Sequence, residues 1–262
     1  MNRTGLFIAL SLALVVGIVF GIYPELDLKL AALFYDPHTH LFPLKLNWLA
    51  AVARDSAIWI VWAIAAPAIA ALVIKLIRPD RPLLISGRAL IFLLATLALS
   101  SGVLANLVFK AHWGRPRPLV VAQLNSGEFP PLDFVAWWDP RGQCGWNCSF
   151  FSGEGSAGFW TIAPAALTPP AWRPFAYAAA TLFGLLTSVL RMAFGGHFFT
   201  DVAAAGLVTF LVIWLGYGFI YRWPRTRLSD EAIDTALTRF AWPFFSLVQR
   251  WRKREAAPKR AV

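Results

Sequence analysis

Long apolar runs separated by polar segments are the main pattern along this chain. A helix of about 20 predominantly apolar residues crosses the core of a bilayer. The runs therefore predict an all-α fold, namely a bundle of six transmembrane helices. The fourth run is short and is ended by Pro169-Pro170. The predicted spans are Leu6–Tyr23, Ser56–Ile77, Ala89–Phe109, Gly153–Leu167, Phe175–Leu190 and Phe198–Tyr221.

The first apolar run has a second interpretation, a cleaved signal peptide, because Arg3 precedes it. No small-residue cleavage site follows, and Tyr23-Pro24-Glu25 stands there instead. We therefore favour an uncleaved helix. Two other segments, Leu26–Phe34 and Glu231–Arg254, carry apolar residues at helical spacing, with a break expected at Pro243. They are predicted to be amphipathic helices on the membrane surface.

Composition and charge support a membrane protein. Hydrophobic residues make up 58% of the 262 and charged residues 15%, which is too apolar for an ordinary soluble domain. The net charge of +10 could indicate nucleic-acid binding. However, basic residues collect on the cytoplasmic side of membrane proteins, so we expect membrane contact and no nucleic acid. The basic positions are Arg78, Arg81, Arg88, Arg173 and the segment from Arg222 onward.

These basic positions also orient the predicted bundle. In a six-span arrangement they all fall on one side, which the positive-inside rule makes cytoplasmic. Residues 1–221 are then one membrane domain and residues 222–262 a basic cytoplasmic tail. The loops 24–55, 110–151 and 191–197 face outward together, so every candidate chemical group lies at the outer face.

The segment Leu190–Asp201, L-R-M-A-F-G-G-H-F-F-T-D, places three chemical groups in an apolar run. Asp201 lies four residues after His197, and positions i and i+4 share a helix face. Asp201 could accept a hydrogen bond from one ring nitrogen of His197. That bond would fix the tautomer and leave the other nitrogen free as a nucleophile. The third group is Arg191, six residues before His197. The alternative for the whole segment is a plain helix start with a chance His and Asp.

Two other outward segments carry groups that suit a phosphate. Lys110 and Arg117 lie in K-A-H-W-G-R-P-R-P and could bind a phosphate. The alternative is that they are ordinary cations at the membrane interface, whose charged ends snorkel into water. Ser152 is a good N-cap residue. The amides of Gly153 and Glu154 would point outward from a helix N-terminus, which attracts phosphate. A plain helix cap is the alternative, but cations and amides together suit a dianionic phosphate.

Other kinds of site are excluded or left open. Gly153, Gly155 and Gly158 match the dinucleotide-binding pattern G-x-G-x-x-G. No strand precedes them and no βαβ unit follows, so we expect no dinucleotide site. No acidic cluster has Mg²⁺- or Zn²⁺-binding spacing, so we expect no metal and no cofactor. Cys144 and Cys148 could form a disulfide that stiffens their loop in an oxidising compartment, or could stay unpaired.

The order K-x6-R-P, then S-G, then R-x5-H-x3-D resembles the type 2 phosphatidic acid phosphatase (PAP2) superfamily. The resemblance covers residues 89–215 by motif, and Arg115-Pro116 is out of register with it. It implies a six-span, metal-independent lipid phosphatase in which His197 forms a phosphohistidine and Asp201 orients it. It also implies phosphate-binding roles for Lys110, Arg117, Ser152, Gly153 and Arg191.

Two positions depart from the family pattern. Leu190 stands where the family usually has Ser, and Glu154 stands where it usually has the His that protonates the leaving oxygen. Glu154 can do this only when protonated, which burial favours and nearby cations oppose. His112 is an outer-face alternative for the acid. The Glu154 departure is similar to a subgroup of lipid A phosphatases of Gram-negative envelopes, of the 4′-phosphatase type.

The resemblance implies an enzyme of the bacterial inner membrane that removes a phosphate monoester from an envelope lipid at the periplasmic face. Lipid A is the first candidate, and undecaprenyl pyrophosphate and phosphatidylglycerophosphate are the alternatives. A phosphotransferase could pass the same phosphoryl group to a lipid acceptor. A non-catalytic lipid-binding scaffold is a third class, against which the retained Arg191, His197 and Asp201 argue.

Overall fold

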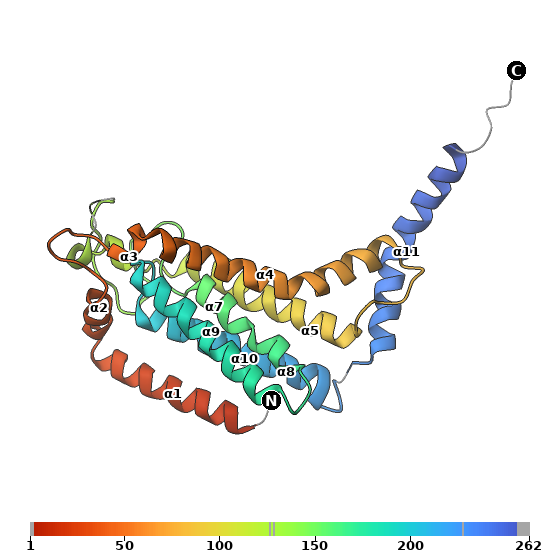
Figure 1. Cartoon of the computed structure of the whole chain (residues 1–262), viewed down its shortest axis with the longest axis horizontal. Coiled ribbons are helices and arrows are strands. Elements are labelled where there is room, and N and C mark those ends of the chain that lie inside the picture. The colour runs from red at the N-terminus through yellow and green to blue at the C-terminus, as the bar shows by residue number, and fades with distance from the viewer. Residues whose placement is uncertain (1–2, 126, 128, 227, 256–262) are drawn as a thin grey trace, which may run out of the picture. The chain divides into compact units, whose positions relative to one another are not determined.

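The computed structural model describes residues 3–125, 127, 129–226 and 228–255, and the regular elements within these ranges are helical (Figure 1). This confirms the all-α prediction. The elements are α1 (Arg3–Ile22), α2 (Glu25–Ala32), α3 (Pro43–Leu46), α4 (Trp48–Ile77), α5 (Gly87–Leu97), the π-helix η1 (Ala98–Phe109), α6 (Lys110–His112), the short η2 (Pro118–Val120) and η3 (Ala122–Leu124), α7 (Gly153–Trp160), α8 (Ile162–Ala166), α9 (Arg173–Ala193), α10 (Phe199–Tyr217), η4 (Gly218–Arg222) and α11 (Asp230–Glu255).

Five helical segments among the described residues are long and apolar enough to cross a membrane. They match five of the six predicted spans, with ends shifted by several residues in places. These segments are Arg3–Ile22, Trp48–Ile77, Gly87–His112, Arg173–Ala193 and Phe199–Arg222.

The remaining predicted span, Gly153–Leu167, is not one helix but the two short helices α7 and α8. Pro164 has no N–H to donate to the carbonyl four residues earlier, so the helical ladder is interrupted there. The Thr161 hydroxyl instead donates to the Gly158 carbonyl at 2.7 Å. The six-span count therefore stays a prediction, with five long spans found.

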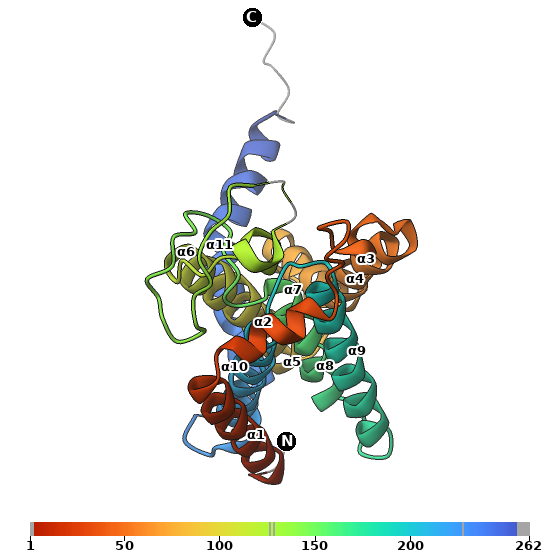
Figure 2. The same ribbon diagram turned by 90° about the vertical axis from the view of Figure 1, so that its left-hand side faces the viewer.

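The chain divides into two compact units, and the first comprises residues 1–64 and 95–216. Within it α7 packs against η1 and α9, and it lies in the middle of the helices of this unit in both views (Figures 1 and 2). Glycines allow this packing: a Cβ at Gly158 would lie 2.2 Å from Thr187 Oγ1, and one at Gly184 would lie 2.4 Å from the Phe159 ring. The N-terminus of α7 is thereby held near the ends of η1 and α9.

A small core lies among the loops of the same unit. It joins α2 to the start of α10 through buried side chains of Ala31, Phe42, Leu119, Val121, Leu124 and Phe198. The predicted helix Leu26–Phe34 is present as α2, but it packs into this core. This core therefore connects segments that lie far apart in the sequence.

The second unit comprises residues 65–94 and 217–262. The Asp230 carboxylate accepts from the Ser86 hydroxyl at 2.6 Å and from Arg88 N at 2.9 Å, and buried Lys75 pairs with Asp234 at 2.9 Å. These bonds fix the start of α11. The predicted helix Glu231–Arg254 is confirmed, but it continues through Pro243, so the predicted break is wrong.

Continuation through Pro243 has a simple cause. Proline in a helix removes one hydrogen bond and bends the axis. A long helix such as α11 can tolerate the loss of this one bond. Several large apolar side chains of α11 are exposed, among them Phe240, Phe244 and Trp251, whereas Ile233 and Ala241 are buried. The predicted tail 222–262 includes residues 227 and 256–262, which lie outside the described residues. The predicted division of the chain into a membrane domain, 1–221, and this tail stays a prediction.

Candidate active site

The three predicted segments meet at one end of the first unit. A Cβ added at Gly153 would lie 3.4 Å from Lys110 Nζ, which places the N-terminus of α7 beside the end of η1. Arg191 Nε, at the end of α9, lies 3.5 Å from Glu154 Oε2. Lys110, Arg117 and Arg191 are called the cation cluster below, and their charges act together on His197.

His197 is almost fully buried, and its ring is held by a backbone carbonyl. Its Nδ1 lies 2.7 Å from the Ser149 oxygen. A carbonyl only accepts hydrogen bonds, so the proton of a neutral ring is on Nδ1 and the lone pair is on Nε2. Burial and the cation cluster lower the pKa of His197 well below its ordinary value. The imidazole is therefore neutral and has a free nucleophilic nitrogen at neutral pH.

The predicted hydrogen bond between His197 and Asp201 is wrong. Asp201 Oδ2 lies 3.9 Å from Nδ1, beyond hydrogen-bond distance. The carboxylate instead accepts from the Phe198 amide at 2.8 Å and from the Ser149 hydroxyl. The Ser149 carbonyl, from the loop before α7, takes the place expected for the carboxylate at His197 Nδ1. Asp201 thus contacts the residue that holds the ring of His197.

Arg115, which the motif leaves out of register, is fully buried beneath this site. Its guanidinium binds Asp201 through Nη1 and Asp27 of α2 through Nη2, the latter at 2.8 Å. Its Cζ also lies 4.4 Å from the ring centroid of Phe198. Breaking a buried ion pair of this kind costs about 3–5 kcal/mol because a charge is left uncompensated. Arg115 therefore holds the side chain of Asp201 in place and ties it to Asp27 of α2.

Sequence reasoning missed Asp27 and Arg115 because they lie 88 residues apart. One signal was available: Asp27 precedes Ala31 by four residues, and both are fully buried on one face of α2. An acid on the buried face of a helix needs a cation, and Arg115 is that cation.

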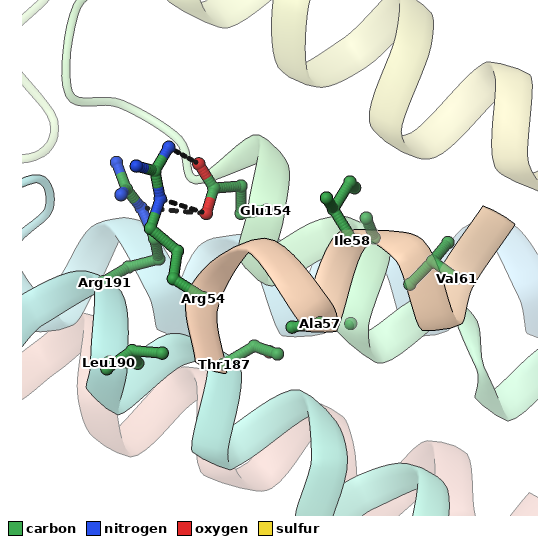
Figure 3. Close-up of a pocket in the computed structure, with 10 residues that line it drawn as sticks. Arg54, Ala57, Ile58, Val61, Glu154, Thr187, Leu190 and Arg191 are labelled. Atoms are coloured by element: carbon green, nitrogen blue, oxygen red, sulfur yellow. Dashed lines mark hydrogen bonds and ion pairs between the residues drawn. The ribbon is translucent and has the colours of Figure 1, made fainter. Parts of the chain in front are cut away.

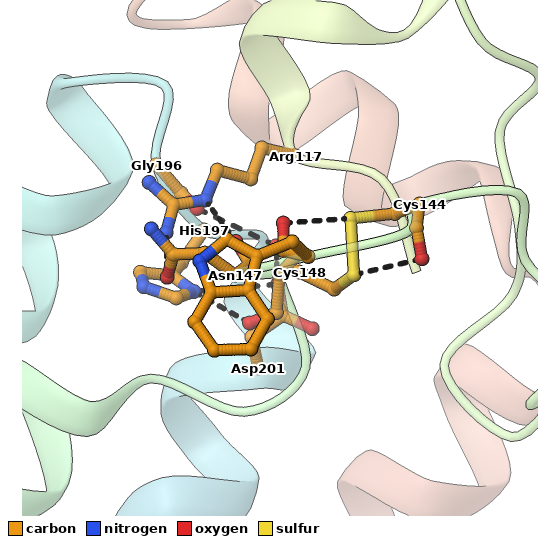
Figure 4. The surroundings of a disulfide bond; sticks show 9 residues. Arg117, Cys144, Asn147, Cys148, Gly196, His197 and Asp201 are labelled. Atoms are coloured by element: carbon orange, nitrogen blue, oxygen red, sulfur yellow. Dashed lines mark hydrogen bonds and ion pairs between the residues drawn. A yellow bond between two sulfur atoms is a disulfide. The ribbon is translucent and has the colours of Figure 1, made fainter. Parts of the chain in front are cut away.

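The loop before α7 is closed by a disulfide between Cys144 and Cys148, which confirms the pairing considered from the sequence (Figure 4). Asn147, inside this loop, has φ of +51°, a left-handed conformation that Asn tolerates better than most residues. Its side-chain oxygen accepts from Arg117 Nη2 at 2.7 Å, and its carbonyl accepts from Arg117 Nε at 3.0 Å. The loop therefore positions one member of the cation cluster as well as His197.

Glu154 is ion-paired with two arginines from different helices. Arg54 of α4 donates to both of its carboxylate oxygens, at 3.0 and 3.2 Å, and Arg191 lies beside Arg54 and approaches the same carboxylate (Figure 3). Both guanidinium groups stabilise the carboxylate form.

Close packing places Arg191 in this pair. A Cβ at Gly196 would lie 2.6 Å from Arg191 Nη2, so the glycine lets the guanidinium pass. Arg191 is 6% exposed, and its Nε has no hydrogen-bond partner among the described residues. A buried donor without a partner is costly, and it lies beside the position that a bound anion would take.

Comparison with known proteins shows the family of this chain. Residues 89–227 match the PAP2 superfamily. The chain belongs to the PAP2 superfamily. It is 32% identical over 227 residues to a lipid A 4′-phosphatase of Francisella tularensis subsp. novicida (strain U112), covering 85% of this chain and 98% of that protein.

Shorter matches have the same description. The PAP2 phosphatase is 33% identical over 119 residues to a lipid A 4′-phosphatase of Rhizobium leguminosarum, covering 45% of this chain and 49% of that protein. A lipid A 4′-phosphatase of Rhizobium etli (strain ATCC 51251 / DSM 11541 / JCM 21823 / NBRC 15573 / CFN 42) is also 33% identical over 119 residues, 45% of each chain. No solved structure matches this PAP2 phosphatase.

The remaining predicted residues of the PAP2 motifs differ in where they lie. Ser152 is the N-cap of α7, as predicted, and its hydroxyl accepts from the Gly155 amide at 3.1 Å. First-turn amides of a helix, here those of Gly153 and Glu154, have no intrahelical partner. His112 is exposed with Nδ1 2.9 Å from the Val108 oxygen, and no contact of the described residues joins it to Glu154.

Metal-ligating groups are not clustered in the described part of the PAP2 phosphatase. No three His, Cys, Asp or Glu side chains there are arranged to hold a metal ion. The residues that the structure brings together instead offer one nucleophilic nitrogen, several cations and the carboxylates of Glu154 and Asp201. That set suits phosphoryl transfer to a histidine.

Proposed function

We propose that this PAP2 phosphatase hydrolyses a phosphate monoester of an envelope lipid, with lipid A as its substrate, through a phosphohistidine on His197. The observation that carries the proposal is the neutral, buried imidazole with Nε2 free beside the cation cluster. The match to a lipid A 4′-phosphatase along 98% of that protein supports the choice of substrate.

The proposed reaction has two chemical steps. His197 Nε2 attacks phosphorus, the N–P bond forms, and the bond from phosphorus to the lipid oxygen breaks in line with it. Glu154 donates a proton to the leaving oxygen. Water then attacks the phosphohistidine, loses its proton to the Glu154 carboxylate, and releases inorganic phosphate and neutral His197. The cation cluster stabilises the charge on the equatorial oxygens in both steps.

A substrate panel tests this proposal. Purified protein should release phosphate from lipid A with kcat/KM roughly tenfold or more above undecaprenyl pyrophosphate and phosphatidylglycerophosphate. EDTA should not change the rate. Equal or higher kcat/KM on another lipid would replace the substrate, and transfer of the phosphoryl group to an added lipid instead of water would indicate a phosphotransferase. A protein that releases phosphate from none of them would support the scaffold interpretation.

The same proposal places the protein in the bacterial inner membrane with its site facing the periplasm. The positive-inside rule supports this orientation, and the disulfide of the outer loop suits an oxidising compartment. Cysteine introduced at exposed Phe129 should react with an impermeant reagent in intact spheroplasts, whereas cysteine at exposed Phe240 of α11 should react only after permeabilisation. The reverse pattern would invert the topology.

A further inference from the structure

Arg54 faces the candidate site from α4, a helix that carries none of the PAP2 motifs. Its guanidinium donates two hydrogen bonds to the Glu154 carboxylate and remains 39% exposed. It lines a narrow crevice with Glu154 and Arg191, whose walls include Ala57 and Ile58 (Figure 3). Arg54 is thus placed at the open side of the site, where a ligand has access to it.

Arg54 and Arg191 converge on one carboxylate oxygen. Arg54 Nε lies 3.2 Å and Arg191 Nε 3.5 Å from Glu154 Oε2. Like charges held this close repel each other unless an anion lies between them. A single carboxylate satisfies this pair incompletely, since Arg191 Nε has no hydrogen-bond partner among the described residues.

We infer that Arg54 is a fourth phosphate-binding cation, held in place by Glu154 until the substrate's phosphate replaces the carboxylate. The inference rests on the proposed function. A phosphate monoester is a dianion with more acceptor oxygens than a carboxylate, and guanidinium groups bind such oxygens in pairs. Arg54 and Arg191 are already side by side, so phosphate binding needs only the withdrawal of one side chain.

The exchange also changes the state of Glu154. The carboxylate loses its ion pair with Arg54 and comes to lie beside a dianion, and both changes favour its protonated form. Substrate binding would thereby prepare the proton that the leaving oxygen needs. Arg54 is a substrate-contacting residue in this account, rather than only a partner of Glu154.

A double-mutant cycle separates these two roles. Arg54→Gln should weaken vanadate binding, measured as the vanadate-dependent rise in Tm, roughly 10- to 100-fold. The loss should be similar in a Glu154→Gln background, and Arg54→Lys should restore part of it. The kcat/KM for lipid A should fall by a comparable factor with Arg54→Gln alone.

Matched variants make the result interpretable. Arg141→Gln removes a similar bidentate pair, with Asp139, from an arginine that is 85% exposed in the outer loop. It should leave vanadate binding and turnover unchanged. If Arg54 acts only on Glu154, its effect on vanadate binding disappears in the Glu154→Gln background, which would overturn the inference. Absence of turnover on lipid A would overturn the proposed function instead, while vanadate binding still tests Arg54.

Discussion

Replacing His197 with alanine should abolish phosphate release while the protein stays folded and inserted in the membrane. The variant removes the imidazole nitrogen that is proposed to form the phosphoenzyme, and the protonated cations supply no nucleophile in its place. Removal of an enzyme nucleophile lowers kcat by roughly 10⁴–10⁶-fold. His197 Nδ1 makes one hydrogen bond, to the Ser149 carbonyl, so its loss leaves a single buried acceptor without a donor.

Phosphate release from lipid A, with Tm in detergent as the check on folding, measures this effect. His38→Ala is the matched control, since His38 is exposed in another outer loop and should keep full activity. A His197→Ala protein with substantial turnover would contradict the phosphohistidine mechanism.

The pH dependence of the wild-type enzyme tests the same residue. The lowered pKa of His197 keeps the imidazole unprotonated to a more acidic pH than an ordinary histidine. The acidic limb of kcat/KM should therefore lie below about pH 6.5, the ordinary histidine value. An acidic limb at or above this value, absent from the profile of vanadate binding, would mean that the nucleophile titrates as an exposed histidine does.

The sequence predicted features that depend on neighbours along the chain. Apolar runs identified five spans, and the spacing of the PAP2 motifs selected residues that the ends of η1, α7 and α9 bring together. The sequence did not predict ion pairs between distant segments, such as Arg54 with Glu154 or Asp27 with Arg115. Tertiary packing alone decides which of these side chains meet. The expected His197–Asp201 bond failed for the same reason: the Ser149 carbonyl arrives from a loop 48 residues away.

The structure changes what is expected of Glu154. In the absence of substrate its carboxylate is held by Arg54 and Arg191, so it is ionised and is not yet an acid. A role in catalysis therefore requires that the phosphate compete for these guanidinium groups. A carboxylate beside a bound phosphate dianion takes up a proton more readily, whereas one still paired with Arg54 does not.

Glu154→Gln should accordingly lower kcat on lipid A by roughly 10²–10⁴-fold, the range for loss of a general acid. Glu154→His should restore part of the rate and move the alkaline limb of the pH–rate profile. The matched control is the substrate: p-nitrophenyl phosphate releases a phenolate that is stable without a proton, so its kcat should fall far less with glutamine. An equal loss on both substrates would mean that Glu154 acts on phosphate binding, through Arg54. A glutamine variant with near-wild-type kcat and an unchanged profile would leave Glu154 only a structural partner of the two arginines.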